Sequence, residues 1–82
     1  MTDRSTAITW YRTVAAGCER AAIWLDDVAA GRTPTGEGPI PLDLARNVPA
    51  RLLRQWANNE RANRARFLAA ANNLITNRRA QP

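Results

Sequence analysis

Amide and guanidinium side chains recur at a fixed spacing in the second half of the chain, and both groups are suited to binding. The spacing is fourteen residues, almost four α-helical turns, so on one helix the two copies point within about 40° of each other. Asparagine is a mediocre helix former, so propensity does not explain why six of the seven Asn lie in this segment. The two copies are Ala57-Asn58-Asn59 with Asn63-Arg64, and Ala71-Asn72-Asn73 with Asn77-Arg78.

This repeat predicts a binding face, and several partners fit it. Guanidiniums neutralise phosphates and amides pair with adenine edges or phosphate oxygens, which favours DNA or RNA. Amides stacked between helices set the register of an oligomer, which favours a protein-binding or self-associating seam. A small anionic ligand such as a nucleotide, captured at an oligomer seam, is a third hypothesis, and a merely solvated helix is the fourth. The predicted binding residues are Arg54, Asn59, Arg61, Asn63, Arg66, Asn73, Asn77, Arg78 and Arg79.

Charge is distributed unevenly along the chain. The 82 residues carry 12 Arg and no Lys against 7 acids, which gives a net charge of +5. Residues 1–32 balance four acids with four Arg, whereas residues 50–82 carry seven Arg against Glu60 alone. A polyanionic partner would therefore meet the second half of the chain.

The residues that most enzymes use are scarce. The chain has no His, no Lys and a single Ser, and its adjacent Asp26 and Asp27 point about 100° apart on a helix. Cys18 is the only cysteine, so it can form neither an intramolecular disulfide nor a cysteine-based metal site, and we expect it to be buried. We therefore expect no catalytic residue, no metal and no cofactor. The two aspartates are expected to attract the Arg-rich helix of the same or a neighbouring chain.

Two long helices are predicted to position these residues. Apolar residues spaced four and three apart over about three heptads predict the first helix, over about 6–30. Trp10, Gly17 and Trp24 flank that stripe at seven-residue steps, so the apolar arc is broader than one partner helix covers. The residues predicted for the core or an oligomer contact are Trp10, Tyr11, Val14, Cys18, Trp24, Leu25, Trp56, Phe67 and Leu74.

A Gly- and Pro-rich segment over 31–41 separates the two helices. Three Gly and three Pro in eleven residues predict an irregular loop, and Gly31 with a proline soon after it predicts the end of the first helix. The segment lacks the preceding strand and the Gly-Lys-Ser/Thr of a phosphate-binding loop. A short helix is predicted over 42–47, and a long basic helix over about 49–79 with Asn47 as its N-cap.

The residues after the short helix allow two interpretations. The spacing of Val48, Leu53 and Trp56 resembles the back half of a helix-turn-helix, where an apolar turn residue precedes the recognition helix. The segment before the turn is about two residues too short for that motif. A hydrophobic corner that packs Leu42, Leu44 and Val48 against the hairpin is the favoured interpretation.

Glu60 and Arg64 interrupt the apolar face of the last helix for more than two turns, between Ala57 and Phe67. Either the helix leaves its partner there, or the polar groups are buried and must be paired. The interruption favours an oligomer seam, because a monomeric hairpin should be most apolar at this point.

Together these patterns predict an all-α chain, a single domain over 1–82 that folds as an antiparallel hairpin of two long helices with a short helical corner. The broad apolar arc predicts assembly into a homo-oligomeric bundle. The expected function is a non-enzymatic interaction or inhibitor module, such as a host-factor regulator from a phage or mobile element, with nucleic-acid binding as the alternative. No segment approaches the roughly 18 apolar residues of a membrane span, and no signal pattern opens the chain, so we expect no membrane contact and a cytoplasmic location.

Overall fold

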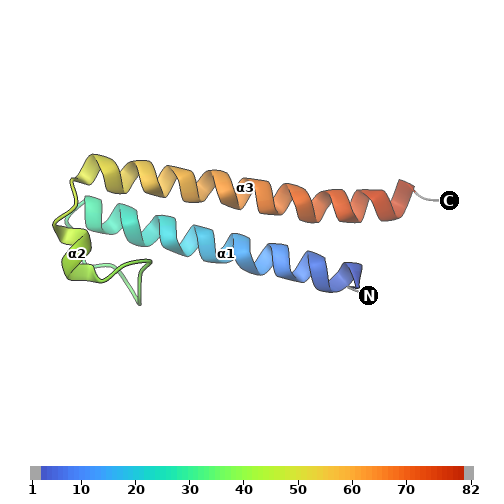
Figure 1. Cartoon of the computed structure of the whole chain (residues 1–82), viewed down its shortest axis with the longest axis horizontal. Helices are drawn as coiled ribbons and strands as arrows, with labels where there is room; N and C mark the ends of the chain where they lie inside the picture. The colour runs from blue at the N-terminus through green and yellow to red at the C-terminus, as the bar shows by residue number, and fades with distance from the viewer. Residues whose placement is uncertain (1–2, 81–82) are drawn as a thin grey trace.

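Two long helices run side by side and a short helix lies at the corner between them (Figure 1). The computed structural model describes residues 3–80, with side chains described over 3–76. The elements are α1 (Arg4–Ala29), α2 (Leu42–Arg46) and α3 (Ala50–Ala80), so the described chain is all-helical. The predicted helical hairpin is confirmed, and its assembly into an oligomer stays a prediction.

α1 begins at a side-chain cap. Asp3 is the N-cap, and its carboxylate accepts a hydrogen bond from the Ser5 backbone N–H at 3.3 Å. The Asp3 carbonyl also accepts from the Ala7 N–H at 3.1 Å, which closes the first helical turn. The helix therefore starts at Arg4, slightly earlier than the predicted Thr6.

α1 ends at the predicted glycine. Gly31 takes a φ of +78°, and its N–H donates to the Val28 carbonyl at 3.0 Å. The next residue, Arg32, donates its N–H to the Asp27 carbonyl at 2.8 Å. This pair of bonds is a Schellman motif, which needs a left-handed residue at its centre and satisfies the last carbonyls of the helix.

Asn47 caps the short helix behind it rather than the long helix ahead. Its Nδ2 donates to the Asp43 carbonyl at 3.0 Å, so the prediction that it caps α3 is wrong. The first turn of α3 uses the Pro49 carbonyl, which accepts from the N–H groups of Leu52 at 3.0 Å and Leu53 at 3.2 Å. A proline here loses no hydrogen bond, because the first N–H groups of a helix have no partner within it.

The core lies at the corner end of the hairpin. Leu25 and Leu53 are the largest fully buried side chains, and most of the other core residues are small. Small residues let the helices approach closely, so this end packs tightly. The buried core cluster consists of Ala22, Trp24, Leu25, Val28, Ala45, Leu53 and Ala57.

The segment between the long helices forms a hydrophobic corner. Leu42, Val48 and Trp56 pack against the core, as this interpretation requires. α2 has only five residues, which is too short for the first helix of a helix-turn-helix. Leu44 is 55% exposed, so its predicted packing against the hairpin is wrong.

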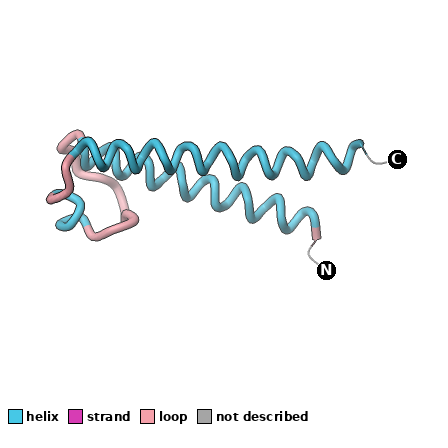
Figure 2. The backbone as a smooth tube through the Cα atoms, turned by 45° about the horizontal axis from the view of Figure 1, so that its top comes forward, coloured by secondary structure: helices cyan, strands magenta, loops and turns pink. Residues whose placement is uncertain are grey.

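The hairpin is packed less well toward the chain termini. Figure 2 shows α1 and α3 moving apart in that direction. Aromatic rings span the wider gap, with the Phe67 centroid 6.0 Å from Trp10 and 6.2 Å from Tyr11. Trp10 is nevertheless 56% exposed, so it does not belong to the core of a single chain. Of the other predicted core residues, Cys18, Trp24 and Leu25 are buried, and Tyr11, Val14, Trp56, Phe67 and Leu74 are half-buried.

Candidate functional site

Two arginines of α3 are engaged inside the chain, and one of them, Arg61, is among the predicted binding residues. The Arg61 guanidinium pairs with the Asp26 carboxylate of α1. Nε of Arg64 lies 3.4 Å from Oε2 of Glu19, also on α1. Asn58, three residues earlier on α3, accepts a further hydrogen bond from the Arg61 guanidinium at 3.2 Å. Because both guanidiniums are paired with carboxylates of α1, these two arginines add less positive charge to a surface for a polyanion than unpaired arginines would.

The two adjacent aspartates act separately, as their different directions on the helix require. Asp26 receives Arg61 of the Arg-rich helix, as predicted. Asp27 instead pairs at 3.0 Å with Arg32, just beyond the end of its own helix. Both carboxylates therefore serve the fold of this chain.

Glu60 faces α1 and lies beside the Cys18 thiol. Burial of Cys18 raises the pKa of its thiol, and the charge and hydrogen bond of the Glu60 carboxylate raise it further. A thiol with a raised pKa carries little thiolate at neutral pH, which disfavours a nucleophilic role for Cys18. With Arg64 paired to Glu19, the polar interruption of α3 is satisfied within the hairpin, and it no longer argues for an oligomer seam.

The side of α3 that points away from α1 is polar and basic, and we call it the outward face. Within residues 3–76 it carries no carboxylate, because Glu60 is the only acid of α3 and is turned toward α1. Three of its arginines, Arg51, Arg54 and Arg66, make no ion pair with a described acid. The exposed residues that helical spacing places on the outward face are Arg51, Leu52, Arg54, Gln55, Asn58, Asn59, Ala62, Ala65, Arg66, Ala69, Asn72, Asn73 and Thr76.

The predicted binding residues are only partly brought together. Arg54, Asn59, Arg66 and Asn73 are exposed on the outward face, so both halves of the repeat contribute to one surface. Asn63 is half-buried, and Arg61 is exposed but ion-paired. The side chains of Asn77, Arg78 and Arg79 lie outside the described residues.

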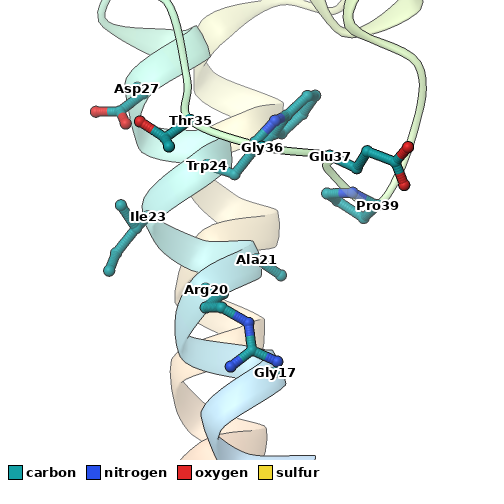
Figure 3. A pocket seen from close by; sticks show the side chains of 10 residues that line it. All are labelled: Gly17, Arg20, Ala21, Ile23, Trp24, Asp27, Thr35, Gly36, Glu37 and Pro39. Carbon is teal, nitrogen blue, oxygen red and sulfur yellow. The ribbon is translucent and has the colours of Figure 1, made fainter.

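A second surface lies along one side of the hairpin, and we call it the aromatic side. It follows Trp10, Gly17 and Trp24 on α1, with Phe67 of α3 against Trp10. At the corner end of this side the loop passes over Trp24, which is 4% exposed (Figure 3). Toward the termini the same side stays open, and Trp10 lies on the surface.

A pocket of about 650 Å³ opens where the covered and open parts of the aromatic side meet (Figure 3). One wall is α1 and the other is the loop over 35–39. The indole Nε1 of Trp24 is buried there and finds no hydrogen-bond partner among the described residues. The residues lining the pocket are Gly17, Arg20, Ala21, Ile23, Trp24, Asp27, Thr35, Gly36, Glu37 and Pro39.

Gly38 makes the covering of Trp24 possible. A Cβ at this position would collide with the Trp24 indole ring, so the loop can lie on the ring only with glycine there. Composition predicted a loop over these residues, but only the three-dimensional path shows which glycine contacts the tryptophan.

Comparison with protein-family models, with curated proteins and with solved structures found no match to this chain. Within the described residues, no group of three or more His, Cys, Asp or Glu side chains is placed to hold a metal ion. None of the helices in the described part combines the length and apolar character that a membrane crossing needs.

Proposed function

We propose that the chain is a non-enzymatic helical interaction module that self-associates through its aromatic side and offers the outward face of α3 to a macromolecular partner. The observation that carries the proposal is the aromatic side itself, where Trp10 stays 56% exposed next to half-buried Tyr11 and Phe67. Aromatic clusters of this kind are typical of protein contacts, because large rings gain most from burial.

The exposed area of the chain supports self-association. The chain exposes 5967 Å², whereas a compact monomer of 9.1 kDa exposes about 4,900 Å². The excess of about 1,000 Å² is as large as the roughly 800 Å² that one partner contributes to a standard interface. The radius of gyration is 16.0 Å, whereas a compact domain of this length has about 12 Å. The large radius and the large exposed area have the same cause, because the two helices form a single thin layer.

The outward face suits a second partner. Its alanines, Ala62, Ala65 and Ala69, let a helix or strand approach the backbone of α3, and the amides beside them offer both donors and acceptors. Arg54 and Arg66 add positive charge that favours an acidic protein surface.

A matched pair of substitutions tests the self-association. Trp10 and Leu44 are almost equally exposed, at 56% and 55%, but only Trp10 lies on the aromatic side. We expect Trp10→Ser to weaken self-association at least tenfold and Leu44→Ser to leave it unchanged, measured by sedimentation velocity, with circular dichroism confirming that both variants are helical. Equal self-association of the two variants contradicts the proposed surface.

Nucleic-acid binding is the second candidate function, and the absence of carboxylates from the described outward face favours it. Each phosphate contact that is lost reduces the dependence of log affinity on log salt by about 0.9 for duplex DNA. Replacing Arg51, Arg54 and Arg66 with Ala should therefore lower the slope by about two to three units, while Arg12→Ala on α1 leaves it unchanged. A parent chain that binds neither DNA nor RNA at low salt excludes this candidate.

A further inference from the structure

Gly17 is a glycine that the isolated chain does not need. It lies in the middle of α1, where glycine destabilises a helix relative to alanine. A Cβ at this position would meet only Nη2 of Arg20, at 3.8 Å, which is ordinary van der Waals contact. No part of the described chain therefore requires position 17 to lack a side chain. Gly17 faces the open aromatic side.

Trp10 and Trp24 are placed symmetrically about this glycine. Each lies seven residues from Gly17, which is about 10 Å along the helix axis in opposite directions. The two tryptophans differ in their surroundings. Trp10 is exposed, whereas Trp24 is buried beside the pocket between α1 and the loop.

We propose that two copies of the chain pack their α1 helices antiparallel, with the twofold axis at Gly17, so that Trp10 of each copy enters the pocket of the other. This proposal rests on the proposed self-association and specifies its geometry. A twofold axis reverses the direction of the second helix, so the partner's Trp10 lies level with Trp24. The two glycines meet at the axis, where the absence of side chains lets the backbones come close.

The pocket suits an indole ring. Its volume of about 650 Å³ lies in the range of pockets that take small organic molecules. Ala21 and Pro39 offer apolar walls, and Arg20 offers a guanidinium that stacks favourably on an aromatic face. Ile23, which is 54% exposed, also lines the pocket.

A bulky residue at position 17 tests the close approach. Leucine is a better helix former than glycine, so Gly17→Leu leaves the folding of the hairpin intact. The added side chain should separate the α1 helices of the two copies. We expect this variant to raise the dimer dissociation constant at least tenfold by sedimentation equilibrium. Ala16→Leu, at an exposed position about 100° around the helix, should leave the constant within twofold of the parent. A Gly17→Leu variant that dimerises as tightly as the parent overturns the geometry but not self-association, whereas a monomeric parent overturns both.

Disulfide trapping tests the direction of packing, in chains that also carry Cys18→Ala. Gly17→Cys places two thiols at the axis, so mild oxidation should give a covalent dimer. Thr6→Cys is the control, because antiparallel packing separates its two copies by about 33 Å. Covalent dimer from Gly17→Cys but not from Thr6→Cys is the expected result. Efficient trapping of both variants would mean parallel packing, and trapping of neither would mean that the chains associate through another surface. Either result overturns the proposal.

Discussion

Asp26 on α1 accepts a hydrogen bond from the Arg61 guanidinium on α3, a residue 35 positions further along the chain. Together with the pair between Glu19 and Arg64, it lines one edge of the hairpin with ion pairs that bridge α1 and α3. The aromatic side lies on the opposite edge, where Trp10 contacts Phe67. The charged edge of the hairpin is thus ion-paired within the chain, whereas the apolar edge leaves Trp10 exposed.

The Asp26–Arg61 pair should contribute a small amount to stability. Its side chains are 33% and 47% exposed, so solvent screens the interaction, and a double-mutant cycle with Asp26→Asn and Arg61→Gln should give a coupling of about 0.2–1 kcal/mol. The coupling should shrink in high salt. Arg54→Gln, at an arginine of the outward face, should show no coupling to Asp26→Asn. A coupling for Arg54 as large as that for Arg61 would mean that the measured term is general charge, not the pair.

Gly38→Ala should destabilise the fold, because the added Cβ forces the loop away from Trp24. We expect a loss of about 1–3 kcal/mol in chemical denaturation, as for other overpacked sites. The same substitution should cost less in a Trp24→Leu background, where the smaller side chain leaves room for the Cβ. Equal losses in the two backgrounds would show that the glycine is needed for a reason other than the indole ring.

Two leucines near the corner should respond very differently to truncation. Leu53 is 2% exposed in the core, so Leu53→Ala should cost about 2–5 kcal/mol of unfolding free energy. Leu44 is 55% exposed, and Leu44→Ala should change stability by less than about 0.5 kcal/mol. Thermal or urea unfolding measures both. A loss for Leu44 comparable with that for Leu53 would mean that α2 packs on the hairpin through its other side.

Stability should fall as the pH rises past the ordinary pKa of a thiol. The folded state raises the pKa of Cys18, so near pH 8.5 and above the unfolded chain releases its thiol proton before the folded chain does. The contribution of the protonated thiol to the free energy of unfolding is therefore complete below that pH and is lost progressively above it. Cys18→Ala should flatten the decline, and Glu60→Gln should reduce it, because one cause of the raised pKa is removed. An unchanged decline in Cys18→Ala would assign it to other groups.

Helices and their ends could be predicted from the sequence because local signals determine them. Gly31 ends α1 through a motif that needs only neighbouring residues, and the heptad spacing of α1 predicted which side meets α3. Asn47 was assigned to the wrong helix because its side chain can reach backbone groups on either side of it. Spacing alone does not decide between them.

The partners of Glu60 and of Arg64 could not be predicted in the same way. On a helical wheel both residues interrupt the apolar face of α3, and their partners, Cys18 and Glu19, belong to the other helix. The partners depend on the register between α1 and α3, which loop length and packing set jointly. Gly38 was missed for the same reason, since its contact with Trp24 depends on how the loop returns over α1.

Self-association through the aromatic side is tested most directly by sedimentation equilibrium of the unmodified chain across the micromolar range. A chain of 9.1 kDa that pairs through this side should approach twice that mass as its concentration rises, and fit a reversible monomer–dimer equilibrium. A single species at the monomer mass throughout that range would contradict self-association, and the exposed Trp10 would then need a different partner.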